Sequence, residues 1–254
     1  LLDPLLFAKS PIRWVEAFRR VTATPTAAPN FGYELTVLKA KPDRSLDLSS
    51  LRIAFCSAEP IRHGTFTKFS EKFSPFGFKR DAFKPSYGLA EATVAVAGEL
   101  GHYQTRELSI SALRENRLEK PEREREATHL VSCGVPLGEL EVRIVREGVV
   151  QPPDTLGEIW LRGPSIAAGY WNSTPESDPF SSYLQSGEGP FLKTGDQGFR
   201  DSQGCLFVTG RLQDLIIIRG QNFHPHDIEA TLEEELPNLR KGCTAAFQLK
   251  DWLG

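Results

Sequence analysis

The chain has 254 residues, 40% of them hydrophobic and 25% charged, which suffices for one large core or two small ones. Its 30 basic and 33 acidic residues give a formal net charge of −3, which argues against a surface for nucleic acid or an anionic membrane. No apolar run approaches the roughly 20 residues of a membrane span, and the N-terminus lacks the order of a signal peptide. We therefore expect a cytoplasmic protein with no membrane span and no nucleic-acid partner.

The positions of the cysteines and the absence of methionine also limit the interpretation. The four cysteines lie far apart in apolar contexts and form no CxxC pair, which predicts buried, reduced thiols instead of disulfides or a zinc site. They are Cys56, Cys133, Cys205 and Cys243. The chain contains no methionine and begins at Leu1, so we expect it to be a fragment of a longer protein.

The first part of the chain predicts helices that alternate with strands. Apolar residues at helical spacing after Pro11 indicate a helix, and the small-residue loop 22–29 leads to a second helix that ends near Lys39. A buried strand is predicted over 51–57, and a helix with three phenylalanines on one face follows it. This alternation is typical of an α/β fold with layers and parallel strand pairing.

The middle of the chain changes character. Residues 99–128 are dense in charge and predict a surface insertion at about Thr105–Arg125, part helix and part loop. The segments EVRIV and GEIWLRG that follow alternate in polarity, which predicts a small β-rich subdomain that serves as scaffold. Its core would be capped by Trp160, Tyr170 and Trp171.

The stretch Thr209–Glu229 predicts a joint between two domains. The short β-branched strands Cys205–Thr209 and Leu215–Ile218 flank a polar crossing segment, and Pro225 stands where a helix could begin. One apolar stripe on that helix would consist of Ile228, Leu232 and Leu236. The neighbouring His224 and His226 could form a metal pair, but no third ligand candidate lies nearby, so a solvated loop before the helix is favoured.

Three short segments combine residues that suit a nucleotide, although each also has a plainer interpretation. Thr194-Gly195-Asp196 is either a simple turn or a carboxylate that accepts hydrogen bonds from two ribose hydroxyls. Tyr87-Gly88-Leu89-Ala90-Glu91 is either core packing beside a surface acid, or an aromatic face for a purine, a glycine at a phosphate and a carboxylate for Mg²⁺. Ser57-Ala58-Glu59-Pro60 forms a turn at the end of a strand, whether or not it contacts a nucleotide.

Taken in order and spacing, these segments resemble the motifs of the adenylate-forming enzymes, which include acyl-CoA synthetases, luciferases and nonribosomal adenylation domains. The wording IIIRGQNFHPHDIEA and YGLAEAT is most similar to the fatty acyl-AMP ligases. The resemblance implies that 1–211 is the C-terminal portion of the large α/β domain, with layered sheets, the β-rich subdomain and the insertion. Residues 212–254 would then be the hinge and the incomplete start of a small α+β domain.

The resemblance also implies roles for individual residues. Glu91 and Thr93 would be catalytic, and Glu91 would hold Mg²⁺, while Thr93 would supply a substitute for the threonine hydroxyl that Ala90 lacks. The nucleotide would be bound by Ser57, Ala58, Glu59, Tyr87, Gly88, Leu89, Ala90, Asp196, Phe207 and Arg211. The acyl pocket would be lined by Asn30, Phe31, Gly32 and Tyr33, and the hinge would be formed by Gln213 and Asp214. Gln213 stands where relatives mostly carry Asp or Lys.

The function that the resemblance implies is activation of a fatty acid with ATP and Mg²⁺ to an acyl-adenylate, with release of pyrophosphate. The acyl group would pass to the phosphopantetheine thiol of an acyl carrier protein or of a carrier domain in a polyketide or nonribosomal synthase. The insertion would hinder the closure that coenzyme A requires. Two alternatives stay open: a long-chain acyl-CoA synthetase, and a non-catalytic nucleotide-binding remnant, because the family's phosphate loop would precede Leu1 and its lysine would follow Gly254.

Overall fold

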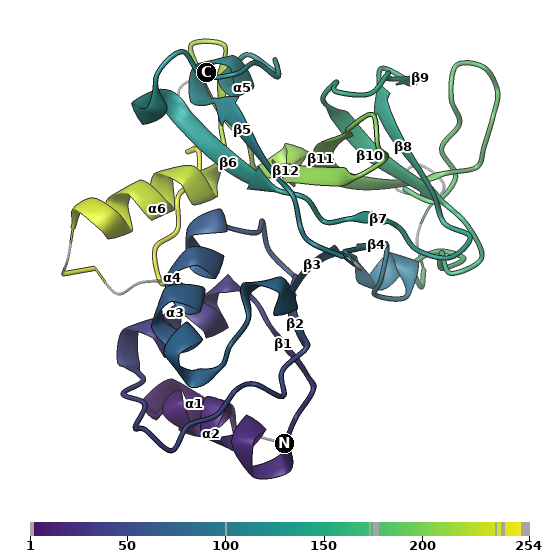
Figure 1. Ribbon diagram of the computed structural model, residues 1–254. Helices are drawn as coiled ribbons and strands as arrows, with labels where there is room; N and C mark the ends of the chain where they lie inside the picture. The colour runs from purple at the N-terminus through teal and green to yellow at the C-terminus, as the bar shows by residue number, and fades with distance from the viewer. Residues whose placement is uncertain are drawn as a thin grey trace. The chain divides into compact units, whose positions relative to one another are not determined.

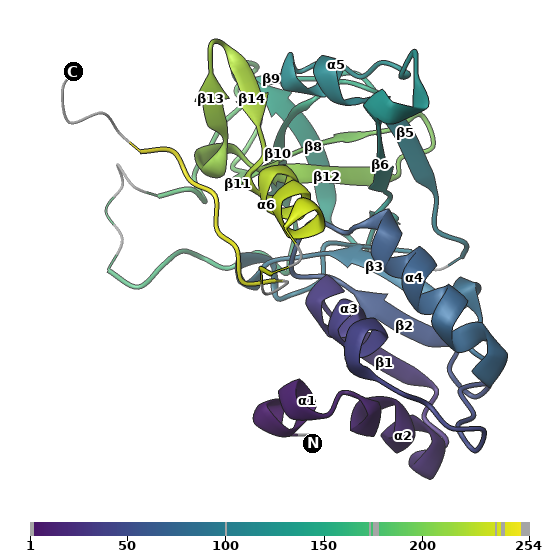
Figure 2. The same cartoon turned by 90° about the vertical axis from the view of Figure 1, so that its left-hand side faces the viewer.

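The computed structural model describes residues 3–99, 101–172, 174, 178–236, 238–239 and 242–249 (Figures 1 and 2). By the density of internal contacts the chain divides into two compact units. The first unit is Leu1–Arg106 with His129–Gly138, and the second is Glu107–Thr128 with Glu139–Gly254. The expected division into domains 1–211 and 212–254 stays a prediction.

The first unit is built on a five-stranded sheet of order β1-β2-β3-β4-β7. The strands are β1 (Pro25–Ala28), β2 (Ile53–Cys56), β3 (Phe83–Tyr87), β4 (Ala97–Gly98) and β7 (Val135–Pro136). The first three pair in parallel and the last two are antiparallel, so the predicted α/β class with parallel pairing is confirmed.

Strand β1 corrects one prediction. The stretch 22–29 was predicted to be a loop because of its prolines, yet part of it pairs in parallel with β2. Pro25 is the first residue of this edge strand, where its missing amide donor is tolerated. The neighbouring strand β2, distant in sequence, supplies the hydrogen bonds that the local pattern does not reveal.

Four helices accompany this sheet: α1 (Pro4–Lys9), α2 (Ile12–Val21), α3 (Asn30–Lys39) and α4 (His63–Phe73). The helices predicted from apolar spacing are therefore confirmed at α2, α3 and α4. Helices α3 and α4 pack against each other beside the strands (Figure 2). Their aromatic side chains form the core: Phe66 stacks on Phe83 with ring centroids 4.0 Å apart, and Tyr33 contacts Phe69 and Phe83 edge-on.

The second unit contains an antiparallel sheet of order β12-β11-β10-β8-β9, which is the predicted β-rich subdomain. Its strands are β8 (Glu141–Arg146), β9 (Val149–Val150), β10 (Gly157–Arg162), β11 (Leu192–Arg200) and β12 (Leu206–Arg211). A 3₁₀ turn over Leu212–Asp214 leads to the hairpin of β13 (Ile216–Ile218) and β14 (Gln221–Phe223), and α6 (Pro225–Glu235) follows. Pro225 begins that helix, as predicted.

The insertion contains more regular structure than the sequence predicts. Strand β5 (Thr105–Ser109) pairs with β6 (Ala127–Val131), and the short helix α5 (Ile110–Arg114) lies between them. The predicted helical part is confirmed. Leu108 and Ala112 are almost fully buried, so the insertion is packed on one side and is not a purely solvated segment.

Two predictions about burial are wrong. Trp160 lies in the core of the β-rich sheet, but Tyr170 and Trp171 are 52% and 93% exposed and do not cap it. Cys243 is exposed, because it lies in a segment without secondary structure, whereas the other three thiols are buried. Burial, and then the carboxylate of Glu59, raise the pKa of the Cys56 thiol, so this cysteine is an inert core residue.

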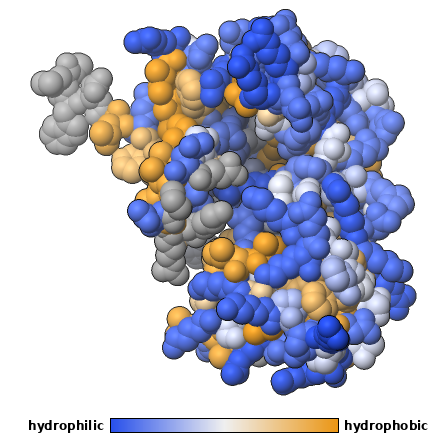
Figure 3. Space-filling view, turned by 60° about the vertical axis from the view of Figure 1, so that its left-hand side comes forward, coloured by the Kyte–Doolittle hydropathy of each residue, from blue (hydrophilic) through white to orange (hydrophobic). Residues whose placement is uncertain are grey.

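The face drawn in Figure 3 is mostly hydrophilic, with hydrophobic residues gathered in separate patches. Within the second unit, exposed apolar side chains occur on hairpin strand β13, at Ile217 and Ile218. No helix in the described ranges has the length and apolarity needed to cross a bilayer.

Candidate functional site

The Thr194-Gly195-Asp196 tripeptide forms a bulge in strand β11. On β10, Glu158 and Trp160 are separated by one residue, but their partners Gln197 and Lys193 on β11 are separated by three. The three residues of the motif therefore lie opposite the single residue Ile159. A bulge of this kind re-aims side chains at the cost of regular ladder bonds, and it is often a functional feature.

Other hydrogen bonds replace the missing ladder at this bulge. The Thr194 hydroxyl donates to the Ile159 carbonyl at 2.8 Å and accepts the Asp196 amide at 3.0 Å. The Gly195 amide donates to a carboxylate oxygen of Glu158 at 3.1 Å. Gly195 has a φ of +73°, a conformation that glycine adopts without strain. The bulge is thus a defined structure and not a flexible turn.

Asp196 and Arg211 are cross-strand partners on β11 and β12. The Arg211 Nε atom lies 3.3 Å from Asp196 Oδ1. The Asp196 side chain is only 10% exposed, whereas the Arg211 side chain is 57% exposed. The structure therefore brings together the two residues that the sequence predicts to bind the ribose. The arginine side chain stays more than half exposed to solvent.

Phe207, also predicted to bind the nucleotide, lies in the core of the same sheet. Its ring stacks on Phe199 at a centroid distance of 4.8 Å, and the residue is almost fully buried. A nucleotide contact from this position would therefore have to come from the main chain.

A buried polar network lies directly beside Asp196. The Thr209 hydroxyl is placed to donate to the carbonyl or the side-chain oxygen of Gln197, at 3.2 and 3.1 Å. The Gln197 amide nitrogen in turn donates to Asn116 Oδ1 at 3.2 Å. Asn116 belongs to the insertion, so this network connects the insertion to the strand that carries Asp196.

In the first unit, the Tyr87–Val94 segment forms a tight turn after β3. The Val94 amide donates to the Leu89 carbonyl at 3.0 Å, and the Val96 amide donates to the Tyr87 carbonyl at 2.9 Å. Thr93 and Val94 have φ values of 56° and 80°, which are unfavourable for β-branched residues. Strain of this kind is often retained at functional sites because the surrounding structure enforces it.

Gly88 has a steric role in that turn. A Cβ atom at this position would lie 1.5 Å from the Val94 carbonyl oxygen. Gly88 therefore lies directly against the backbone of Val94, and its predicted approach to a phosphate stays a prediction. Of the other predicted residues, Tyr87 is buried, Leu89 and Glu91 are half-buried, and Ala90 and Thr93 are exposed.

The Ser57–Pro60 segment leaves β2 in an unusual conformation. Ala58 has a φ of +78°, which is a strained value for any residue with a side chain. The Glu59 carboxylate accepts the Phe31 amide at 3.2 Å, at the N-terminus of α3. The structure thus joins the Ser57–Pro60 segment, predicted to bind the nucleotide, to the segment predicted to line the acyl pocket.

The four residues predicted to line an acyl pocket differ in exposure. Asn30 is fully buried, where its side chain donates to the Pro60 carbonyl and accepts the Arg62 amide. Tyr33 is also buried, and its hydroxyl donates to the Phe55 carbonyl at 2.8 Å. Gly32 packs closely on Ala28. Among the four, Phe31 has the most exposed side chain, and the role of the group in acyl binding stays a prediction.

A family model described as "AMP-binding enzyme" matches residues 3–171, which include the Ser57–Pro60 and Tyr87–Thr93 turns described above. The chain belongs to the AMP-binding enzyme family. The match covers the first unit from Asp3 onward and continues into the β-rich sheet of the second.

Relatives of this AMP-binding chain include two curated ligases. It is 42% identical over 261 residues to the medium-chain-fatty-acid–[acyl-carrier-protein] ligase JamA of Moorena producens (strain JHB), covering 98% of the chain and 44% of that protein. It is 38% identical over 264 residues to the long-chain-fatty-acid–AMP ligase FadD23 of Mycobacterium tuberculosis (strain CDC 1551 / Oshkosh), covering 97% of the chain and 43% of that protein. The chain thus spans less than half the length of these relatives.

Solved structures of fatty acyl-adenylate ligases have the same fold. One from a study of the E. coli and L. pneumophila enzymes aligns with a TM-score of 0.84 and 33% identity, over 97% of this chain and 44% of that chain. A second, from L. pneumophila in complex with acyl adenylate and pyrophosphate, aligns with a TM-score of 0.79 and 36% identity, over 98% of this chain and 45% of that one. The predicted resemblance to fatty acyl-AMP ligases is confirmed.

Sequence reasoning missed two residues in this AMP-binding chain, Glu158 and Gln197. Glu158 was assigned to scaffold, although it stands two residues before Trp160 and therefore on the same face of a strand, a spacing that permits a side-chain pair. Gln197 directly follows the aspartate of the motif, but its contact with Asn116 joins residues 81 positions apart. No sequence pattern reveals a contact of that range.

The predicted hinge residues Gln213 and Asp214 lie in the 3₁₀ turn after β12, and both are exposed. Both side chains therefore lie outside the core. Their role as a hinge stays a prediction that agrees with this exposure.

His224 and His226, predicted to lie in a solvated loop, are instead half-buried and stacked with ring centroids 5.3 Å apart. The His224 ring lies on the backbone of Gly210, where a Cβ would approach Nδ1 to 2.6 Å. No described residue forms a hydrogen bond with that buried Nδ1 atom. Within the described ranges, no group of three or more metal-binding side chains was found.

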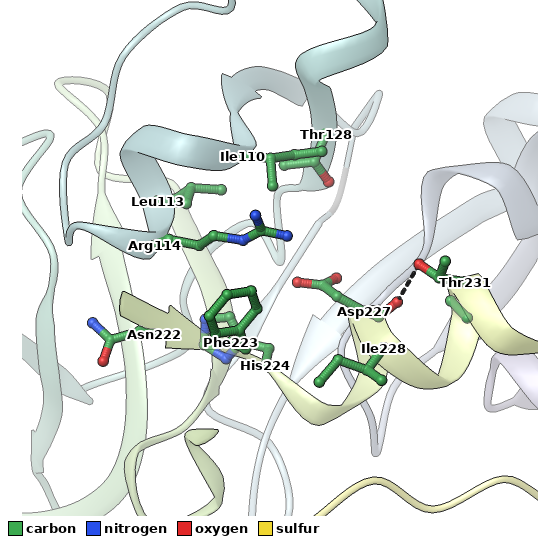
Figure 4. Close-up of a pocket in the computed structure, with 11 residues that line it drawn as sticks. Ile110, Leu113, Arg114, Thr128, Asn222, Phe223, His224, Asp227, Ile228 and Thr231 are labelled. Carbon is green, nitrogen blue, oxygen red and sulfur yellow. Dashed lines mark hydrogen bonds between the residues drawn. The ribbon is translucent and has the colours of Figure 1, made fainter. Parts of the chain in front are cut away.

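The His224 site is part of a cavity of about 270 Å³ within the second unit (Figure 4). Insertion helix α5 contributes Leu113 and Arg114, and the segment after the hairpin contributes Phe223 and Asp227. The Arg114 guanidinium lies 4.4 Å from the centroid of the Phe223 ring. This cation–π contact attaches the insertion to strand β14.

We expect the pH dependence of stability to report on His224. Burial lowers its pKa from 6.5 to about 4, with His226 adding to the effect and Asp227 opposing it. The unfolded chain therefore takes up a proton near pH 6.5 that the folded chain does not take up until about pH 4. The contribution of His224 to stability is complete above pH 6.5 and is lost as the pH falls through 4, by on the order of 3 kcal/mol.

Urea unfolding at pH 7.5 and pH 5 checks this expectation. The His224→Phe variant keeps a ring but cannot be protonated, so it should lose less stability than wild type between the two pH values. His102→Phe, at an exposed side chain that lies 3.0 Å from Asp81, controls for the exchange of a histidine for a phenylalanine. Equal losses in wild type and His224→Phe would contradict the assignment.

Proposed function

We propose that the protein containing this chain activates a fatty acid with ATP to an acyl-adenylate. A carboxylate oxygen attacks the α-phosphorus, and the bond to pyrophosphate breaks, so that pyrophosphate leaves. The observation that carries the proposal is the Asp196–Arg211 pair, held in a structured bulge of an AMP-binding chain. The activities for which JamA and FadD23 are named support the choice of a fatty acid as substrate.

In this proposal Asp196 accepts the ribose hydroxyls, and Arg211 contributes its exposed guanidinium to the same sugar. The Tyr87 ring and the Ser57–Glu59 backbone contact adenine. The protein contributes positioning and charge stabilisation, and no proton transfer is required for the displacement.

Mg²⁺ would supply neutralisation of the phosphate charge, and Glu91 would hold it. Glu91 is half-buried on the 3₁₀ turn after β3, and a carboxylate oxygen is a suitable Mg²⁺ ligand. Mg²⁺ usually takes only one or two protein carboxylates beside substrate phosphates, so a multi-residue cluster is not required.

The acyl acceptor is proposed to be the phosphopantetheine thiol of an acyl carrier protein or carrier domain. The thiol attacks the acyl carbonyl, and AMP leaves. JamA is described as a ligase for an acyl carrier protein, which supports this class of partner. A reaction that uses ATP and a carrier thiol, in a chain with three buried free cysteines, also favours the cytoplasm.

The experiment uses the full-length protein with ATP, Mg²⁺ and fatty acids of graded chain length. Pyrophosphate release and acyl-AMP should appear with the fatty acid and without coenzyme A. Adding a phosphopantetheinylated carrier protein should then give the acyl-carrier thioester. Rapid formation of acyl-CoA would instead indicate an acyl-CoA synthetase, and nucleotide binding without turnover would indicate a non-catalytic module.

The choice between carrier protein and coenzyme A should depend on the contact between insertion and hairpin. Arg114→Ala removes the cation–π contact with Phe223, worth about 1 kcal/mol, and should raise acyl-CoA formation several-fold. Arg117→Ala is the matched control, because Arg117 forms ion pairs with Glu115 and Glu119 inside the insertion. If both variants keep the wild-type product ratio, this contact does not determine the acceptor.

A further inference from the structure

The Glu158 side chain on β10 forms hydrogen bonds both to the β11 bulge and to a residue of its own strand. Its Oε1 atom accepts the Gly195 amide at 3.1 Å, and its Oε2 atom accepts the indole N–H of Trp160 at 2.8 Å. Trp160 is buried in the sheet core, so its ring provides a fixed donor. One carboxylate oxygen of Glu158 is therefore oriented by the buried Trp160 ring, and the other is oriented by Gly195, the central residue of the motif.

Gly195 is the residue of the bulge whose backbone has the fewest steric restrictions. Thr194 is fixed by its hydroxyl bond to Ile159, and Asp196 resumes the pairing with Arg211 on β12. Glycine at Gly195 places no side-chain restriction on its own φ and ψ. Of the hydrogen bonds described at this peptide, the one to Glu158 is the charge-assisted one, and such bonds are stronger than neutral ones.

The Gly195 N–H belongs to the peptide that joins Thr194 to Gly195. A rotation of that peptide would change where Asp196 points, because it changes the φ of Gly195, the residue that directly precedes Asp196. We propose that Glu158 is a positioning residue: it fixes the Gly195 peptide and thereby aims the Asp196 carboxylate at the ribose hydroxyls of the nucleotide. The proposal rests on the proposed function, in which Asp196 binds the ribose. In this proposal Glu158 contacts Gly195 and Trp160, and it acts on the nucleotide only through Asp196.

The test compares Glu158→Ala with wild type in the full-length protein. AMP affinity is measured by calorimetry, and KM for ATP and for the fatty acid are measured by pyrophosphate release. We expect Glu158→Ala to weaken AMP binding and raise KM for ATP by about tenfold, since a charge-assisted bond is lost. KM for the fatty acid should stay unchanged, because the bulge affects only the ribose.

A conservative pair of variants separates positioning from packing. Glu158→Gln keeps an acceptor for Gly195 but turns its amide donor toward the Trp160 N–H, so it should bind AMP several-fold more weakly than wild type. Adding Trp160→Phe removes that opposing donor. The double variant should then recover AMP affinity toward the wild-type value.

Glu141→Gln is the matched control, because Glu141 is a carboxylate of the same sheet that pairs with Arg143 and Arg162 and not with the bulge. It should leave KM for ATP unchanged even where it lowers thermal stability. Wild-type AMP affinity in Glu158→Ala would overturn the proposal, as would an equal rise of KM in Glu141→Gln. If Asp196→Ala also binds AMP normally, the proposed function has failed; if Asp196→Ala loses affinity and Glu158→Ala does not, only the positioning role has failed.

Discussion

Replacing Gly88 with alanine is expected to destabilise the first unit by on the order of 3–5 kcal/mol. The new Cβ would lie 1.5 Å from the Val94 carbonyl oxygen and 2.7 Å from the Val94 carbonyl carbon. These are backbone atoms of a strained turn, so the clash cannot be relieved by a side-chain rotation. Either the turn opens, which moves Glu91 and Thr93, or the unit unfolds.

Urea unfolding with tryptophan fluorescence measures this loss of stability. Calorimetry with AMP measures whether the altered turn still permits nucleotide binding. Gly64→Ala is the matched control in the same unit. Gly64 is an exposed glycine of α4, and no atom lies within 4 Å of the position that a Cβ would take, so alanine should stabilise the helix by about 0.5–1 kcal/mol. A Gly88→Ala protein as stable as wild type would show that Val94 does not hold this close approach in solution.

Asp196→Ala is expected to weaken AMP binding by about 30- to 100-fold. The variant removes the proposed acceptor of two ribose hydroxyls and leaves Arg211 without its carboxylate partner. Hydrogen bonds to a charged group contribute about 1.5–3 kcal/mol, so a net loss of about 2–3 kcal/mol corresponds to this range. Calorimetry with AMP and with a non-hydrolysable acyl-adenylate analogue measures the change.

The control for Asp196 is the aspartate at the other end of the same hairpin. Asp201 accepts the amides of Gln203 and Cys205 in the turn between β11 and β12. Asp201→Asn should lower stability by about 1 kcal/mol without changing AMP affinity. Wild-type AMP affinity in Asp196→Ala, or a comparable loss of affinity in Asp201→Asn, would contradict the ribose-binding role.

The elements predicted best are those whose burial repeats regularly along the chain. Helix α4 has its phenylalanines at helical spacing, and strand β8 alternates in polarity over most of its length, so local periodicity identifies both of them. Strand β1 was missed because its small residues and prolines have no such period. Its state depends on β2, a partner more than twenty residues away.

The residues of the candidate site also divide into those that local patterns predict and those that depend on distant partners. Sequence motifs pointed to Asp196 and Arg211, and the structure shows that they are cross-strand partners. The motifs contain no information about the bulge, because a bulge is a mismatch between two strands and is defined only by both. Glu158 was missed for that reason, and the Gln197–Asn116 contact was missed because it joins residues 81 positions apart.

The sequence by itself determined the family, the α/β class, most helices and strands, and the residue types that suit a nucleotide. Tertiary structure alone decided that Gly88 serves a close approach to Val94, that Trp171 is exposed, and that His224 is packed on Gly210. The physical reason is the range of the interaction. Periodicity and turn chemistry act over a few residues, whereas a steric contact, a strand register or a buried proton site depends on atoms that only folding brings together.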